Sequence, residues 1–203
     1  MNHDKDKLAE KILFFLYSIA SSSNIVNTNT FKRYIYLYYL TESFLNDESD
    51  NISISLDKGS IKILNFDLIL DDFSLKEFIV LKENNIIICD TLIDYVESLL
   101  SNTEGAFFEM YRQISPFVNL LKSYNDQFIF TIFFSEPTFK EARQRGLNIL
   151  DSNSSKLTNL LDRFKKKIKN VNVDEYDVLT YWMDFILKNY YTDEETNNNV
   201  EEC

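Results

Sequence analysis

The stretch Tyr34-Ile35-Tyr36-Leu37-Tyr38-Tyr39-Leu40 decides the fold of this chain. It lies inside a segment, Thr30 to Leu45, whose spacing of apolar residues predicts a helix. Apolar side chains would cover nearly the whole circumference of that helix, which is typical of a helix buried on all sides. We therefore expect it at the centre of the core, with the amphipathic segment Leu8 to Ser21 as a second helix packed against it.

Downstream of this helix the apolar period changes to two, which predicts strands. The expected elements are a β-hairpin over 52–63 with Gly59 in its turn, a short helix over 67–77 capped by Asp67, a second hairpin over 78–89 with its turn at Lys82-Glu83-Asn84, and a helix over 90–100 capped by Asp90. This order over Thr30 to Leu100 is compatible with a winged-helix module, in which a hairpin closes one side of a small helical core.

The remainder of the chain is predicted to be helical. Only 3 Gly and 2 Pro interrupt 203 residues, which favours long helices over an all-β sandwich. The expected helices cover 104–115, a stretch that starts at Pro116, 155–170 and 174–190. Gln127 to Phe134 stays open between a strand, from its β-rich composition, and a buried helix, from the way it is bounded.

The predicted fold class is therefore mostly α with a small antiparallel β component (α+β), a winged-helix-like N-terminal half followed by a C-terminal helical bundle. Residues 1–101 are the expected winged-helix-like module, residues 102–191 a helical extension packed on it, and residues 192–203 a disordered acidic tail. An apolar fraction of 45% is ample for a core and excludes global disorder.

Positive charge is concentrated in one segment of an acidic chain. The formal net charge is −11, yet Thr138 to Asn170 holds nine basic and three acidic residues, a net of +6. Such a segment can contact a partner, a nucleic acid or the acidic surface of the chain itself. The candidate partner- or nucleic-acid-binding residues are Arg143, Arg145, Arg163, Lys165, Lys166, Lys167 and Lys169.

Three interpretations of the basic helix 155–170 remain open. In the first it is a solvated face opposite the expected inward side chains Leu157, Leu160, Leu161, Phe164 and Ile168. In the second it contacts an acidic element, which includes the chain's own Asp193-Glu194-Glu195. In the third it binds the backbone of a nucleic acid without sequence preference.

The short helix 67–77 is the candidate recognition helix of the winged-helix-like module. Its charged residues argue against sequence-specific binding to DNA. It contains Asp67, Asp71, Asp72 and Glu77 against a single Lys76. Phosphate charge dominates the affinity for DNA, so a recognition helix is normally basic. We therefore expect this module to bind protein or to be structural.

Signals for catalysis are poor. The only histidine is His3, so Ser-His, Cys-His and two-His metal chemistry lack a base or ligand. The glycines lie too far apart for a phosphate-binding loop. Cys89 and Cys203 have neither disulfide nor metal-pair spacing. The sequence predicts no enzyme activity, no cofactor, no metal site and no small-molecule substrate.

The same composition indicates a cytoplasmic protein without membrane contact. The first apolar run, Ile12 to Ala20, is short and holds Tyr17 and Ser18, so we expect no signal peptide. No stretch approaches the roughly 18 apolar residues that a membrane span needs. Two cysteines without a pairing pattern fit a reducing compartment.

A family resemblance lies in three stretches of the first hundred residues. They are Lys32-Arg33-Tyr34-Ile35-Tyr36-Leu37-Tyr38-Tyr39-Leu40, then Ile61-Lys62-Ile63-Leu64-Asn65-Phe66-Asp67, and then Phe78-Ile79-Val80-Leu81 with Ile86-Ile87-Ile88-Cys89. In the order of its elements and its tyrosine-rich helix the chain resembles the small middle components of bacterial three-component ABC-ATPase systems, which include the accessory subunit of Lamassu-type antiviral defence.

The resemblance implies a non-catalytic adaptor that joins an SMC-like or AAA-type ATPase to an effector protein, with nucleic acid reached through the complex. It carries no functional residue over, because the matching positions are core positions. The alternative function is a nucleic-acid-binding protein that uses residues 138–170.

Overall fold

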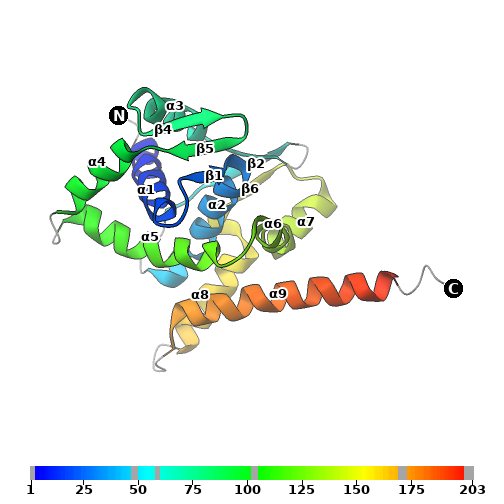
Figure 1. Cartoon of the computed structure of the whole chain (residues 1–203). Coiled ribbons are helices and arrows are strands. Elements are labelled where there is room, and N and C mark those ends of the chain that lie inside the picture. The colour runs from blue at the N-terminus through cyan, green and yellow to red at the C-terminus, as the bar shows by residue number, and fades with distance from the viewer. Residues whose placement is uncertain (1–2, 47–49, 58–59, 102–104, 169–172, 199–203) are drawn as a thin grey trace.

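The computed structural model describes residues 3–46, 50–57, 60–101, 105–168 and 173–198. These residues are mostly helical, with two small three-stranded antiparallel sheets (Figure 1). The predicted α+β class with a small antiparallel component is confirmed at this level.

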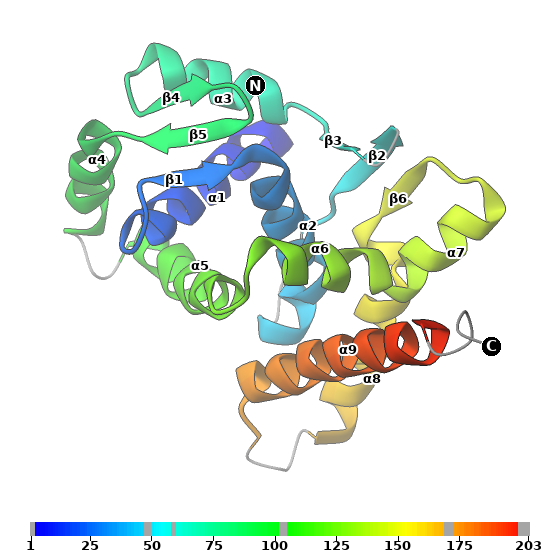
Figure 2. The ribbon, with the colours of Figure 1, turned by 45° about the vertical axis from the view of Figure 1, so that its right-hand side comes forward.

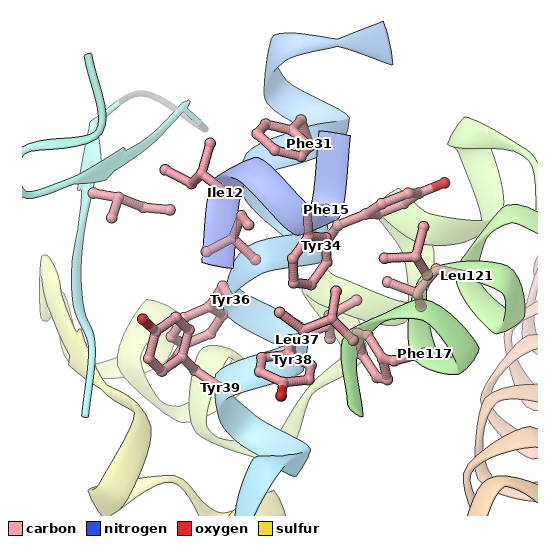
Figure 3. Packing of buried hydrophobic residues seen from close by; sticks show 14 of the residues in the cluster. Ile12, Phe15, Phe31, Tyr34, Tyr36, Leu37, Tyr38, Tyr39, Phe117 and Leu121 are labelled. Atoms are coloured by element: carbon pink, nitrogen blue, oxygen red, sulfur yellow. The ribbon is translucent and has the colours of Figure 1, made fainter. Parts of the chain in front are cut away.

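The tyrosine-rich helix is central, as predicted. It is α2 (Thr28–Leu45), and its side chains from Tyr34 to Leu40 are buried on every side. Phe15 of α1 (His3–Ala20) and Phe117 of α5 (Ala106–Lys122) pack edge-on against Tyr38 of α2, with ring centroids 5.4 and 5.3 Å apart (Figure 3). Edge-to-face aromatic pairs of this kind add to the stabilisation from burial itself.

Local hydrogen bonds set the two ends of α2. The side chain of Asn27 accepts from the backbone N–H of Asn29 and Thr30, at 3.0 and 3.3 Å, and so satisfies two donors that the helix leaves unpaired. At the other end the N–H of Asn46 donates to the carbonyl of Glu42 at 2.7 Å. No basic residue lies in the last turn of α2.

The first sheet, sheet A, contains β1 (Ile25–Asn27), β4 (Ile79–Lys82) and β5 (Asn85–Ile88) in the order β1-β5-β4. The predicted hairpin over 78–89 is confirmed, although Lys82 belongs to the strand and Glu83, at φ 54°, makes the turn. Strand β1 was not predicted, because three residues are too few to show a period of two.

The β4-β5 hairpin of sheet A is preceded in the chain by α3 (Phe66–Leu75). The expectation that Asp67 caps this helix is wrong. Asn65, at φ 64°, is the residue before the helix, and Asp67 lies in the first turn. A carboxylate there still complements the positive end of the helix dipole. In the same way Cys89, and not Asp90, precedes α4 (Asp90–Leu100).

The second sheet, sheet B, joins distant parts of the sequence. The predicted hairpin is present as β2 (Ser53–Asp57) and β3 (Ser60–Ile63), while Gly59 lies outside the described residues. A third strand, β6 (Ile149–Asp151), pairs with β2 in the order β3-β2-β6. Figure 2 shows the two sheets well apart from each other, with α1 beside sheet A and sheet B next to α7 (Pro137–Arg145).

The expectation that a new helix starts at Pro116 is wrong, because Pro116 lies inside α5. A proline within a helix removes one hydrogen bond and costs about 3 kcal/mol or more. Ile114 before it and Phe117, Val118 and Leu121 after it are all fully buried. A continuous apolar face that packs on α1 therefore outweighs the cost of the proline.

The open segment 127–134 is helical. It forms most of α6 (Asp126–Ser135), capped by the side chain of Asn125, which accepts from the N–H of Phe128 at 2.9 Å. Helix α7 starts at Pro137, at the break that the sequence indicated, and the buried carboxylate of Glu136 accepts from the N–H of Phe139 at 2.8 Å.

The last two helices are α8 (Lys156–Ile168), which follows a 3-10 turn at Ser152–Ser154, and α9 (Glu175–Asn198). We expected the final helix to end near Tyr190 and a disordered tail to follow. Instead α9 continues through Asn198, since no glycine or proline interrupts it. Residues 199–203 lie outside the described residues.

The core extends across the predicted boundary at residue 102. Helix α5 packs on α1, α8 packs on α2, and β6 pairs with β2. Side chains from Leu8 to Met183 belong to one hydrophobic cluster. The elements after residue 102 therefore complete the core that α1 and α2 begin.

Candidate functional site

The basic residues of 138–170 are divided between two helices. Lys140, Arg143 and Arg145 are exposed on α7, and Lys156 begins α8. The others occupy the last turns of α8, except Lys169, which lies outside the described residues. The fold brings the two groups to opposite ends of α8.

A carboxylate lies within the first of these groups. Glu141 of α7 pairs with Arg145, Nη2 to Oε1 at 2.5 Å, and with Lys156, Nζ to Oε2 at 2.7 Å. The hydrogen bond from Lys156, together with the charge of Arg145, lowers the pKa of the Glu141 carboxyl. Glu141 therefore stays ionised and offsets part of the positive charge near α7.

Lys165 has a structural role. Its Nζ donates to the backbone carbonyls of Ser43 and Asn46, at 3.1 and 3.2 Å, at the C-terminal end of α2. A cation there complements the negative end of the helix dipole. Beside it, Ser43 Oγ donates to Asp162 of α8 at 2.6 Å. Lys165 and Asp162 thus hold α8 in place against α2.

The last turns of α8 also carry exposed cations, Arg163, Lys166 and Lys167. The same face is partly apolar. Leu157 and Leu161 are buried as expected, but Leu160 is 57% exposed, which corrects that predicted inward position. Phe164 is partly covered, because its ring packs on Phe44 of α2 with centroids 6.4 Å apart while 38% of the residue stays exposed. The side chain of Ile168 lies outside the described residues. Helix α8 is covered where it packs on α2, on α7 and on the 3-10 turn before it.

We call the exposed set Leu160, Arg163, Phe164 and Lys167 the α8 face. These residues follow the spacing i, i+3, i+4, i+7, so they lie on one side of the helix. The leucine and the phenylalanine were both expected in the core, because amphipathic spacing shows which residues share a side of a helix but not how much of that side is covered. The α8 face can accept an apolar surface that carries negative charge.

A second unusual surface belongs to α3. Its buried side carries Phe66, Ile69, Leu70 and Phe73. Its outer side, the α3 face, carries five residues, of which Leu68 is 57% and Leu75 84% exposed. The α3 face consists of Asp67, Leu68, Asp71, Asp72 and Leu75.

Two carboxylates of the α3 face bind lysines of the chain. Asp67 pairs with Lys32 and Asp72 with Lys5, each with Nζ to Oδ at 3.2 Å. The aspartates of this helix are exposed, and the exposed leucines add an apolar character that was not predicted from the sequence. Burying one such leucine contributes about 1.5–3 kcal/mol.

A buried ion cluster links α1 to α2. Lys11 Nζ lies 2.6 Å from Glu42 Oε1, 3.0 Å from Asp50 Oδ2 and 4.3 Å from the centre of the Tyr39 ring. Burial raises the pKa of the Glu42 carboxyl. At Asp50 burial acts in the same direction, but hydrogen bonds from Lys7 and Lys11 and the charge of Lys11 lower the pKa overall. Every charge in this cluster has an opposite charge beside it.

The ion cluster borders a pocket of about 340 Å³ between α1, α2 and the chain around Asp50 and Asn65. Acidic, basic and apolar side chains all line it, and two of its charged groups, Lys7 and Asp50, bind one another at 2.8 Å. The pocket therefore offers neither a nucleophile with a base nor a uniform charge for a substrate.

Within the described ranges, no three His, Cys, Asp or Glu side chains gather in a way that could hold a metal ion. Over the same residues, none of the helices has the length and apolar character to cross a bilayer.

A scan against protein-family models and searches of curated proteins and solved structures gave no significant match to this chain.

Proposed function

We propose that this chain is a non-catalytic adaptor, an accessory subunit of a cytoplasmic bacterial antiviral complex that contains an SMC-like ATPase and an effector. The observation that carries the adaptor role is the α3 face, where leucines are exposed among aspartates. The resemblance of the first hundred residues to three-component ABC-ATPase systems supports the class of complex.

We further propose that the front half is a winged-helix-like unit made of α1, β1, α2, α3, β4 and β5. The strand order β1-β5-β4 supports this, because the strand before α2 pairs with the returning strand of the hairpin that follows α3. The β2-β3 hairpin is then an insertion between the two helices α2 and α3. In this arrangement α3 occupies the position of a recognition helix.

The chemistry of α3 favours protein over DNA at that position. The helix carries three aspartates and no basic residue, so it repels phosphates. Its exposed leucines gain nothing from a hydrated groove but gain apolar contact from a protein surface. The partner expected on the α3 face has an apolar patch rimmed by Lys and Arg, since complementary charge steers such encounters.

The test is co-expression of the tagged chain with the products of the genes next to its own, followed by affinity purification. We expect the parent chain to retain the ATPase. A variant with Leu68→Asp and Leu75→Asp should lose it, because both changes place charge in the apolar contact. Leu147→Asp is the matched control, since Leu147 is 52% exposed and lies away from α3.

Thermal unfolding of each variant should match the parent, because all three leucines are exposed. If the α3 variant keeps the ATPase as well as the control does, the α3 face is not the docking site. If the parent retains no neighbouring product, the adaptor proposal itself is wrong.

A second candidate function is nonspecific nucleic-acid binding by the last turns of α8. The observation in its favour is the exposure of Arg163, Lys166 and Lys167 within about one helical turn. Three phosphate contacts would give a slope of about −2.7 in a plot of log K against log salt for duplex DNA. Fluorescence anisotropy with labelled DNA at several salt concentrations measures this slope, and Lys166→Glu with Lys167→Glu should abolish it.

A further inference from the structure

We infer that two copies of this chain associate through their C-terminal helices, with α9 of each copy packed on the α8 face of the other. This inference goes beyond the proposed adaptor function and does not use the α3 face.

Helix α9 has a covered side and an exposed side. Leu179 and Met183 are fully buried, where α9 packs mainly on α6 and to a smaller extent on α2 and α5. On the opposite side Tyr181 is 76% and Phe185 65% exposed. We call the exposed set Asp177, Tyr181, Asp184 and Phe185 the α9 face.

The spacing of the apolar residues matches on the two faces. Leu160 and Phe164 are one helical turn apart on α8, and Tyr181 and Phe185 are one turn apart on α9. Side chains at i and i+4 lie about 5–6 Å apart at Cβ, so each pair makes a compact apolar patch of the same length. Two helices can pack these patches together by inserting the side chains of one between those of the other.

The charges of the two helices are opposite. Helix α8 has five basic residues and one acidic residue, a net of +4, while α9 has six acidic residues and one basic residue, a net of −5. Around the apolar pairs, Arg163 and Lys167 on α8 correspond to Asp177 and Asp184 on α9. The occupant that fits the α8 face is therefore an acidic helix with one exposed apolar pair, and α9 is such a helix.

The α9 of the same chain does not fill this role. Its inward side chains attach it to α6, and its exposed pair points away from that contact. Figures 1 and 2 show α9 near the lower edge of the molecule. A second copy can reach this exposed side without any change in the chain.

Symmetry makes the contact large enough. One helix pair buries less than the roughly 1,200 Å² that stable interfaces usually require. In a two-fold dimer the same contact forms twice, because α8 of each copy packs on α9 of the other. Both faces of each copy are then occupied, so no further copy can add. The dimer therefore doubles the buried area and leaves the α3 face of each copy open.

The test is sedimentation equilibrium of the full chain at micromolar concentration, where we expect a dimer. Arg163→Glu with Lys167→Glu should weaken it by at least about 100-fold, because like charges then meet across the interface. Asp177→Lys with Asp184→Lys should do the same. Combining all four changes in one chain restores opposite charges and should restore the dimer.

Two controls and one further α9 variant accompany these variants. Lys140→Glu with Arg143→Glu makes the same charge change on α7 and should leave the dimer intact. Because Asp184 accepts a hydrogen bond from the Tyr124 hydroxyl at 2.9 Å, Phe185→Ser is a second α9 variant that keeps this bond and should still weaken the dimer. Leu68→Asp with Leu75→Asp on the α3 face should remain dimeric, which separates this inference from the adaptor proposal.

The inference is overturned if the parent is monomeric throughout the micromolar range, or if the α8 and α9 variants are as dimeric as the α7 control. It is also overturned if the four combined changes fail to restore the dimer while circular dichroism shows a folded chain.

Discussion

Helices α2 and α8 are both rich in apolar residues, but the fold uses them differently. The apolar residues of α2 from Tyr34 to Leu40 surround the helix and are all buried. Among the predicted inward side chains of α8 that the structure describes, Leu157 and Leu161 are buried, Leu160 is 57% exposed, and Phe164 is 38% exposed with its ring against Phe44. A helix that is apolar all round can only lie inside, whereas an amphipathic helix still leaves open how much of its apolar side is covered.

The largest effect should come from α2. Tyr38→Ala removes a ring that is 1% exposed and packs on two phenylalanines, so unfolding should become easier by about 3–5 kcal/mol. Urea unfolding followed by circular dichroism measures the change. A variant as stable as the parent would show that α2 is not the centre of the core.

A matched pair on α8 tests the difference within one helix. Leu157→Ala should cost about 2–4 kcal/mol, because Leu157 is fully buried. Leu160→Ala should change the free energy of unfolding by less than about 0.5 kcal/mol, because its side chain is largely in solvent. Equal costs for the two variants would mean that α8 is rotated relative to the structure described.

The tyrosines of α2 should make the core sensitive to alkaline pH. Burial, with a smaller effect of Asp126, raises the pKa of Tyr34 from 10.0 to about 12, and burial also raises the pKa of Tyr36, Tyr38 and Tyr39. Above pH 10 the unfolded chain releases these protons while the folded chain retains them. Stability is therefore full below pH 10 and falls as the pH rises towards 12.

The contribution of Tyr34 can be isolated with Tyr34→Phe. This variant should lose about 2–3 kcal/mol less than the parent across that pH range, since one pKa unit corresponds to about 1.4 kcal/mol. Urea unfolding at a series of pH values measures the difference. Identical pH profiles would show that Tyr34 titrates as an exposed phenol does.

The smallest effect concerns two neighbouring lysines of α8. Lys165→Met removes the hydrogen bonds to the last carbonyls of α2 and should cost about 1 kcal/mol. Lys166→Met makes the same change at an exposed position and should cost less than about 0.5 kcal/mol. Thermal unfolding measures both changes. An equal shift in melting temperature for the two variants would show that Lys165 has no structural role.

Local signals predicted most of the helices and both hairpins, because apolar period, turn residues and breakers act over short distances. The short strands β1 and β6 and the continuous helix through Pro116 were missed. Each depends on a partner far away in the chain: β1 on β5, β6 on β2, and the helix around Pro116 on α1. No window of sequence contains such a partner.

The candidate surfaces were predicted in part for the same reason. The acidic side of α3 and the basic end of α8 could be read directly from the order of charged residues. The structural use of Lys165 and the neutralising effect of Glu141 could not, since both require knowing which helices lie side by side. The exposure of Leu68, Leu75, Leu160 and Phe164 likewise follows from where neighbouring helices stop.

The sequence by itself determined that α2 is buried, that the fold is helical with small antiparallel sheets, and that positive charge gathers in residues 138–170. The apolar period and the composition are properties of the sequence, so they are the same in any arrangement of the helices and strands. Only the tertiary structure decided which apolar residues of α3, α8 and α9 remain in solvent and which lysine caps α2. Whether one of these residues is buried depends on which distant elements of the chain contact it.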